Sequence, residues 1–191
     1  MRLTLLSGPA AEPLELDDVK AHLRLDGDDE DALLASLITT SRSHVETALG
    51  LALITQSWRW QADCWPRNGL VELMTRPIQS VDRVAVRAAD GTQTVIDATD
   101  YILDVSGQTG RLAPSEGHWP KPGARLGGIE IDFTVGYGNA ATDVPEPIRQ
   151  ALRLLVAHWY EVRNPVHIGQ MATRVPDTVS ELLMPYRVRR I

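Results

Sequence analysis

The sequence predicts an α+β protein in which N-terminal helices and a long C-terminal helix form a small bundle. An antiparallel β domain is inserted between them, and an extended C-terminal tail follows. Apolar residues recur at a period of about 3.6 near both ends of the chain and at a period of two in between. The expected parts are residues 1–52 (N-terminal helical part), 53–142 (β-rich insertion), 143–164 (closing helix) and 165–191 (docking tail).

Composition limits the class of protein. The chain has 191 residues, of which 43% are hydrophobic and 23% charged, as expected for a folded domain with an insertion. No apolar run reaches the roughly 18 residues that a membrane-spanning helix needs, so we expect no membrane partner. Cys64 is the only cysteine, which rules out an intrachain disulfide and suits synthesis in a reducing cytoplasm.

Two helices are expected in the N-terminal part. Leu3–Leu6 is expected to form a small strand or a packing arm, and a short helix should run from Leu16 to about Leu25. A longer helix should run from Glu30 to Leu49 and end before Gly50. Three apolar residues of this second helix share one face and are assigned to the bundle core or an interface: Leu34, Ile38 and Val45.

An acidic run between these helices raises the question of a metal site. Its members are Asp26, Asp28, Asp29, Glu30 and Asp31. The run lacks the glycine and the glutamate that a calcium loop of the EF-hand kind has at positions 6 and 12. Acidic residues also stabilise a helix N-terminus through its dipole, so we expect no metal there.

The insertion reads as a series of short strands. The expected strands cover Ile54–Gln61, Val71–Met74, Val81–Arg87, Thr94–Asp97, Tyr101–Val105 and Ile129–Val135. Asp90-Gly91 predicts a hairpin between the third and fourth strands, and Tyr101–Val105 is expected to continue the same sheet. The stretch from Gly107 to Gly123 is rich in glycine and proline and is expected to be rich in turns.

The closing helix should cover Val144–Asn164. Asp143 is a candidate cap for its start, and Asn164-Pro165 should end it. Its apolar stripe includes Ile148, Leu152, Leu155 and Trp159, which are assigned to the bundle core or an interface. Burial of such side chains contributes roughly 1.5–3 kcal/mol each before entropy is counted, so this helix needs a partner.

Signals for enzymatic chemistry are weak. The five histidines are scattered and form no zinc-like spacing with each other or with Cys64. There is no GxSxG elbow, Walker loop or GxGxxG motif, and a hydrolase built on Cys64 would need a histidine beside it in space. Five tryptophans could stack on bases, but such platforms come with a positive groove and the net charge is −6. Packing roles are therefore preferred.

The charge is unevenly distributed. Residues 164–191 carry a formal charge of +2, and the other 163 residues carry −8. Apolar side chains lie among the arginines of this C-terminal end, which suits docking on another molecule. The alternatives are a solvated tail and a tail that folds back onto its own β domain.

Several segments together resemble one family, the head–tail connector proteins of tailed phages. The resemblance is carried by LELDDVKAHLRLDGDDEDALLASLITTSRSHVETALGLALITQSW at residues 14–58, FTVGYG at 133–138, VPEPIRQALRLLVAHWYEVRNPV at 144–166 and LLMPYRVRR at 182–190. The longer members of this family, found in prophages and gene transfer agents, have a similar intervening sheet. The segments occur in the order and spacing typical of the family, and the resemblance covers nearly the whole chain.

The resemblance implies a structural adaptor that is not an enzyme and has no catalytic residue, cofactor or metal. Such an adaptor forms a ring, of twelve subunits in the particle, beneath the portal protein. It extends the DNA channel without sequence-specific DNA binding and joins the head to a stopper or other neck or tail protein. By position in the motif, the portal-docking tail comprises Leu182, Leu183, Met184, Pro185, Tyr186, Arg187 and Arg189. The alternatives are another neck component (a stopper or tail terminator), a small cytoplasmic hydrolase using Cys64, and a DNA-binding accessory protein.

Overall fold

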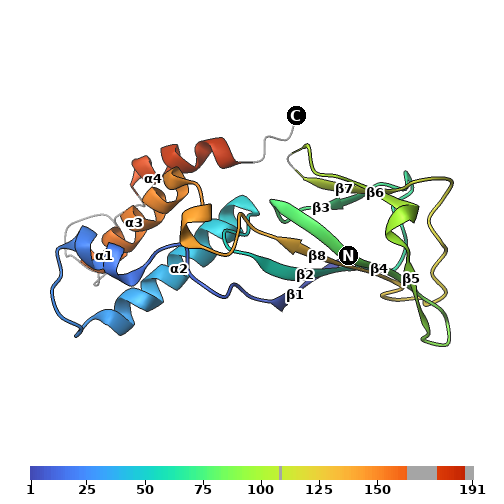
Figure 1. The fold of residues 1–191 in the computed structure, drawn as a ribbon, viewed down its shortest axis with the longest axis horizontal. Helices are drawn as coiled ribbons and strands as arrows, with labels where there is room; N and C mark the ends of the chain where they lie inside the picture. Colours follow the sequence, from blue (N-terminus) through green and yellow to red (C-terminus); the bar gives the residue numbers. More distant parts are fainter. Residues whose placement is uncertain (108, 163–175, 188–191) are drawn as a thin grey trace, which may run out of the picture. The chain divides into compact units, whose positions relative to one another are not determined.

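The computed structural model describes residues 1–107, 109–162 and 176–187. The chain divides into two compact units, a helical unit (residues 11–49 and 138–191) and a β unit (residues 1–10 and 50–137). The predicted α+β class is confirmed, with helices in one unit and antiparallel sheets in the other (Figure 1). Residues 1–10 belong to the β unit, whereas the sequence suggested the helical part. Within the described ranges, no helix is long and apolar enough to span a membrane.

The helical unit is built around α3. The described elements are α1 (Leu16–Leu23), α2 (Asp31–Leu49), α3 (Glu146–Glu161) and α4 (Asp177–Leu183), with the 3₁₀ turns η2 (Ala141–Asp143) and η3 (Met184–Tyr186). α1, α2 and α4 each contact α3. The core includes the fully buried Leu34 and Val45 of α2, and Ile148, Leu152 and Leu155 of α3. α3 therefore has apolar neighbours on more than one side.

Local chemistry explains where these helices end. α1 stops because Arg24 adopts a left-handed conformation with φ of 56°, and α2 stops at Gly50, whose φ of 64° suits a residue without a Cβ. The sequence suggested that Asp143 caps the start of α3, but its side chain does not do so. Its Oδ2 instead accepts a hydrogen bond from the amide of Ala140 at 2.9 Å, and Pro145 occupies the position before α3.

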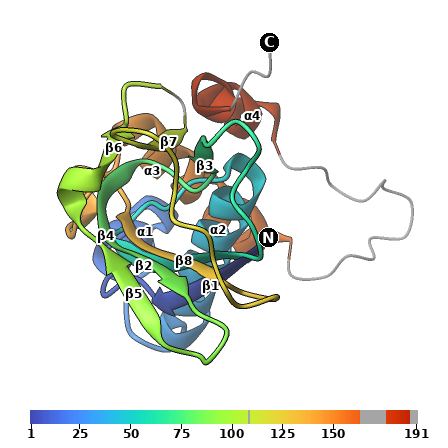
Figure 2. The same ribbon diagram turned by 90° about the vertical axis from the view of Figure 1, so that its right-hand side faces the viewer.

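The β unit contains two antiparallel sheets. The large sheet has the order β1-β2-β8-β4-β5, with β1 (Arg2–Ser7), β2 (Gln56–Ala62), β4 (Ile78–Arg87), β5 (Gln93–Ile96) and β8 (Ile129–Val135). The small sheet has the order β3-β7-β6, with β3 (Val71–Leu73), β6 (Tyr101–Asp104) and β7 (Gly110–Pro114). The hairpin of β4 and β5 is green in Figure 2 and confirms the turn predicted at Asp90-Gly91.

One expectation for the β unit was wrong, and one strand was not expected. Tyr101–Asp104 does not continue the large sheet, because it pairs with β7 in the small one. The stretch expected to be rich in turns also contains strand β7, in which Leu112 is the one large apolar residue. Gly110 in this strand fits closely against the large sheet, since a Cβ there would lie 2.6 Å from Cγ1 of Ile78.

Both sheets contribute to one hydrophobic core. In β8, Ile129, Ile131, Phe133 and Val135 are all fully buried, and the alternate residues lie on the opposite face. Leu73 and Leu112 of the small sheet belong to the same cluster. The two sheets therefore cover each other, which leaves the opposite face of the large sheet for polar side chains.

Candidate assembly surfaces

The predicted bundle residues of α2 and α3 lie mostly inside the helical unit. Leu34, Ile38, Val45, Ile148, Leu152 and Leu155 are all buried. Trp159 is only half-buried, and its indole meets the ring of His44 edge-on with centroids 5.7 Å apart. Of the predicted set, Trp159 is thus the residue whose side chain remains accessible for contact with another molecule.

The described part of the C-terminal segment, residues 176–187, contains a packed helix over Asp177–Leu183, where the sequence allows one or two helical turns. Val179 and Leu183 lie one turn apart on α4 and are buried where this helix contacts α3. Pro185 and Tyr186, expected to be extended, lie in the 3₁₀ turn η3. The segment packs as a helix because α4 is amphipathic and its apolar residues find partners in the helical unit itself.

The predicted docking residues therefore differ in accessibility. Met184, Pro185 and Arg187 are exposed, Leu182 and Tyr186 are half-buried, and Leu183 is buried. Arg189 lies outside the described residues. The backbone turns extended again at Arg187, which has φ of −74° and ψ of 138°. Polar and apolar groups of the segment after Leu183 are thus available at the surface of the helical unit.

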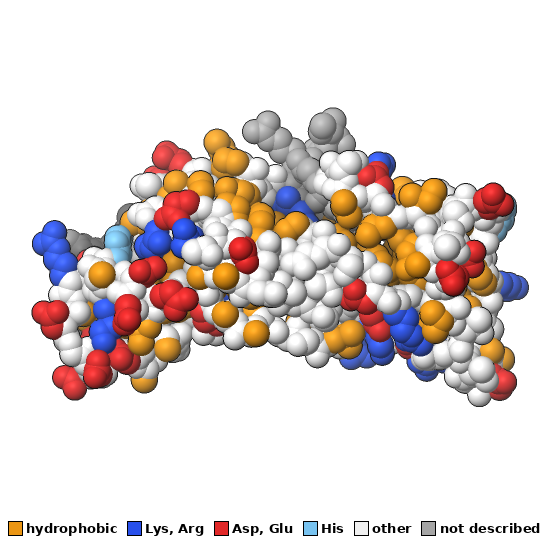
Figure 3. Space-filling view, viewed as in Figure 1, with side chains coloured by type: hydrophobic (Ala, Val, Ile, Leu, Met, Phe, Trp, Pro, Cys, Tyr) orange, Lys and Arg blue, Asp and Glu red, His pale blue; other side chains and the backbone are white. Residues whose placement is uncertain are grey.

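Two carboxylates of the acidic run between α1 and α2 form ion pairs within the chain. Figure 3 shows acidic side chains gathered over this connection with a basic side chain among them. Nζ of Lys20 lies 3.1 Å from Asp28 and 2.8 Å from Asp31, and hydrogen bonding to Asp31 and Asp28 raises the pKa of this lysine. The described residues hold no cluster of three or more His, Cys, Asp or Glu side chains suited to a metal ion.

The face of the large sheet opposite the core carries a charged network, here called the charged face. Its charged members are Arg59, Arg83, Arg87, Glu130 and Asp132. Glu130 is buried and lies within ion-pair distance of all three arginines, including 3.4 Å from Nη1 of Arg83. Arg59 also holds Asp132 through two hydrogen bonds of 2.6 and 2.7 Å, which raise the pKa of its guanidinium. The network fixes long side chains in place over three strands.

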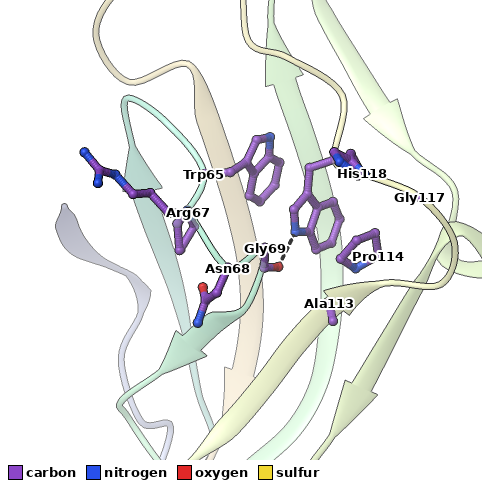
Figure 4. Close-up of a pocket in the computed structure, with 10 residues that line it drawn as sticks. Trp65, Arg67, Asn68, Gly69, Ala113, Pro114, Gly117 and His118 are labelled. Atoms are coloured by element: carbon purple, nitrogen blue, oxygen red, sulfur yellow. Dashed lines mark hydrogen bonds between the residues drawn. The ribbon is translucent and has the colours of Figure 1, made fainter.

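A groove in the β unit is lined by an indole pair. Trp65 and Trp119 stack with ring centroids 4.3 Å apart, and each donates its Nε1 hydrogen to a backbone carbonyl, of Pro120 and Gly69 respectively. The groove has a volume of about 480 Å³, and Arg67 extends away from the indoles in Figure 4. Two satisfied Nε1 groups and a stacked partner are features of structural packing, in agreement with the preference for packing over base stacking.

Comparison with known proteins gives a consistent result. The family profile described as head completion protein matches residues 13–191. A chain from the neck of an empty GTA particle, computed with C6 symmetry, is 27% identical with a TM-score of 0.85. A chain from the virion of a native gene transfer agent (GTA) particle is 28% identical, and one from the neck of a native GTA particle, computed with C12 symmetry, is 26% identical, each with a TM-score of 0.83. Each similarity covers 100% of this chain and 97% of the other. No curated protein sequence matches the chain.

The family match and the full-length likeness to GTA neck chains place the chain among structural proteins that are not enzymes. The chain belongs to the head completion protein family. This confirms the resemblance to head–tail connector proteins and removes the hydrolase alternative, in which Cys64 would be a nucleophile. Cys64 is an exposed free thiol.

The sequence did not indicate the charged face or the indole pair as units. Arg59 and Glu130 are 71 positions apart in the chain, and only the register of β2 with β8 brings Gln61 and Arg59 beside Glu130 and Asp132. Trp65 and Trp119 lie in loops, where periodicity gives no information. Their proximity to prolines was visible, but nothing local indicated that they stack.

Proposed function

We propose that this protein is a neck component of a tailed phage or phage-like particle. It forms a ring beneath the portal, extends the DNA channel and joins the head to the next neck or tail protein. The observation that carries the proposal is the full-length likeness, at 26–28% identity, to chains of gene transfer agent necks and virions. Because the likeness includes both units, the chain is suited to the same position in a particle.

Twelve subunits are proposed for the ring, since the neck of the similar native particle was computed with C12 symmetry. The partners are a portal protein on one side and a stopper or other neck protein on the other. Outside the C-terminal segment the chain carries a formal charge of −8. A channel lined by such a body would let DNA slide, because phosphate binding depends on lysine and arginine contacts.

The C-terminal segment is proposed as the portal contact. Burial of Leu183 anchors the segment, and Met184, Pro185 and Arg187 are the described residues beyond it that have exposed side chains. Each contact can be weak, because copies held in one ring act at high effective concentration. The basic residues Arg187, Arg189 and Arg190 suit an acidic surface on the partner.

Deletion of residues 184–191 tests this proposal while keeping the buried residues of α4. We expect a folded protein with unchanged far-UV circular dichroism, and DNA-filled heads that lack this protein and the tail. Leu126→Ser, at an exposed site of the β unit, is a control that should leave particles intact. If the truncated protein still yields tailed, gene-transferring particles, the docking role is wrong. If the full-length protein is absent from purified particles, the neck role itself is wrong.

A further inference from the structure

The large sheet ends in two strands that each have one partner among the described residues. β1 pairs with β2 at one end, and β5 pairs with β4 at the other. The outer backbone amides and carbonyls of an edge strand can pair with another chain, and proteins usually block such edges with charge, proline or a covering element. Both edges of this sheet are therefore informative about assembly.

The β1 edge is apolar and uncharged beyond its first residue. Leu3, Leu5 and Leu6 are 41%, 46% and 47% exposed, and no charged residue occurs between Arg2 and Glu12. The bulge of this strand lies between Leu5 and Ser7, so the register with β2 is regular from Arg2 to Leu5. This edge lacks the usual protection over four residues.

The β5 edge has matching properties. Gln93–Ile96 is uncharged, and the side chain of Val95 is 58% exposed. Across the sheet, Val95 lies in one row with Ala85, Glu130, Gln61 and Arg2. A second sheet placed beside β5 would continue these rows, and β1 offers uncharged side chains from Leu3 to Ser7.

Strand direction decides which pairing a ring would use. Every neighbouring pair in the large sheet is antiparallel, so β1 and β5, separated by three strands, run in the same direction. Cyclic rings need a heterologous contact, in which one patch of a subunit meets a different patch of the next. Rotation about a ring axis along the strands preserves strand direction and would bring β5 of one subunit beside β1 of the next as a parallel pair.

We propose that neighbouring copies of this chain pair β1 with β5, so that the large sheets join edge to edge around the ring. This inference rests on the ring of the proposed function and adds which surfaces the copies share. The pairing gives backbone hydrogen bonds along up to four residues and covers Leu3, Leu5 and Val95. It also explains why neither edge carries a charge beyond Arg2.

Site-specific cross-linking in assembled particles tests the pairing. In a Cys64→Ser background, Thr4→Cys is combined with Val95→Cys, or with Gln93→Cys two residues away on the same face to allow for register. A short bismaleimide should then produce a ladder of covalent multimers. The matched control combines Thr4→Cys with Ile102→Cys, because Ile102 is also 58% exposed but lies on β6 of the small sheet. This control should remain monomeric.

The outcomes separate this inference from the neck role. A protein that enters particles but forms no ladder with either β5 cysteine overturns the pairing and leaves the neck role intact. Dimers formed with Thr4→Cys alone also overturn it, because they indicate an isologous β1–β1 contact. If the Cys64→Ser parent protein is absent from particles, both the pairing and the neck role are wrong.

A charge swap gives a second, independent measurement. Leu5→Lys should reduce incorporation into particles by placing a charge on the shared edge. Thr94→Glu in the same chain should restore it, because Thr94 lies on the same face of the sheet as Leu5 and would supply a partner across the contact. Leu126→Lys, at a 79% exposed site, controls for added charge. Normal incorporation of Leu5→Lys overturns the proposal.

Discussion

Glu130→Gln tests whether the charged face is a fixed part of the β unit. The carboxylate is buried, with 3% of its side chain exposed. It accepts hydrogen bonds from Gln93, Gln61 and Arg83 at 3.1, 3.2 and 3.4 Å, and a further one from Arg87. Glutamine keeps the shape of the side chain but removes the charge and turns one acceptor into a donor, which then faces other donors.

The expected loss follows from burial and from the exposure of the partners. A hydrogen bond to a charged group contributes about 1.5–3 kcal/mol, and loss of one partner of a fully buried ion pair costs about 3–5 kcal/mol. The side chains of Arg59, Arg83 and Arg87 are 30%, 27% and 37% exposed, so water replaces part of the lost interaction. We therefore expect the free energy of unfolding to fall by about 2 kcal/mol, between the exposed and buried limits.

Urea unfolding followed by tryptophan fluorescence measures this change, because Trp60 lies in the core beneath the charged face. The midpoint should fall at an unchanged m-value. Glu72→Gln is the matched control, since Glu72 is an exposed residue of β3 and should change stability by less than about 0.5 kcal/mol. Equal midpoints for the two variants would refute the reasoning and mean that the arginines are adequately solvated without Glu130.

Three further predictions concern other parts of the protein. Leu152→Ala, at a fully buried site of α3, should lower the stability of the helical unit by about 2–5 kcal/mol, measured by circular dichroism at 222 nm during urea unfolding. Trp119→Phe removes a 2.7 Å hydrogen bond and alters the stack with Trp65, so the near-UV circular dichroism should weaken and stability should fall by about 1–3 kcal/mol. Hydrogen bonds from Ser106, together with Arg111, lower the pKa of Asp104 from 3.8 to about 2. Its stabilising contribution is therefore complete above the ordinary value and is lost as the pH falls towards 2, so the difference in urea midpoint between wild type and Asp104→Asn should shrink over that range.

Elements with a clear period could be predicted from the sequence. β8 spans Ile129–Val135 as expected, because four buried apolar residues alternate with polar ones and both ends are marked by glycine. The two long helices were placed to within three residues at each end, since their apolar stripes are continuous. The β4–β5 turn was also predictable, because Asp90-Gly91 is a local signal. Its geometry includes a hydrogen bond from the amide of Thr92 to Asp90.

Elements that depend on distant partners could not be predicted. β7 is held by pairing with β3 and β6, and with glycine at one end and proline at the other it shows no alternation of its own. The division into two sheets depends on which strand Tyr101–Asp104 joins. Because Tyr101–Asp104 follows β5 closely in the sequence, local reasoning places it beside β5 in the large sheet. Short strands carry little local information about their partners.

Glu130 shows the same limit for a site. In the pattern of β8, Glu130 occupies a position that alternation assigns to solvent, and by local rules it should be exposed. It is buried because long side chains from β2 and β4 cover it. The register of two paired strands decides which residues lie beside each other. The hydrophobic pattern restricts that register only once the partner strand is known.

The C-terminal segment packs on its own chain and still leaves side chains accessible, although its packing partner is the helical unit and not the β domain that the sequence offered as an alternative. Val179 and Leu183 give α4 an apolar face that packs against α3, while Met184, Pro185 and Arg187 remain accessible beyond it. Under the proposed function, an anchored base reduces the chain entropy that docking must overcome, compared with a tail free from residue 165 onward. The packing of α4 thus favours the docking role, because it presents the last residues from a defined point on every subunit of a ring.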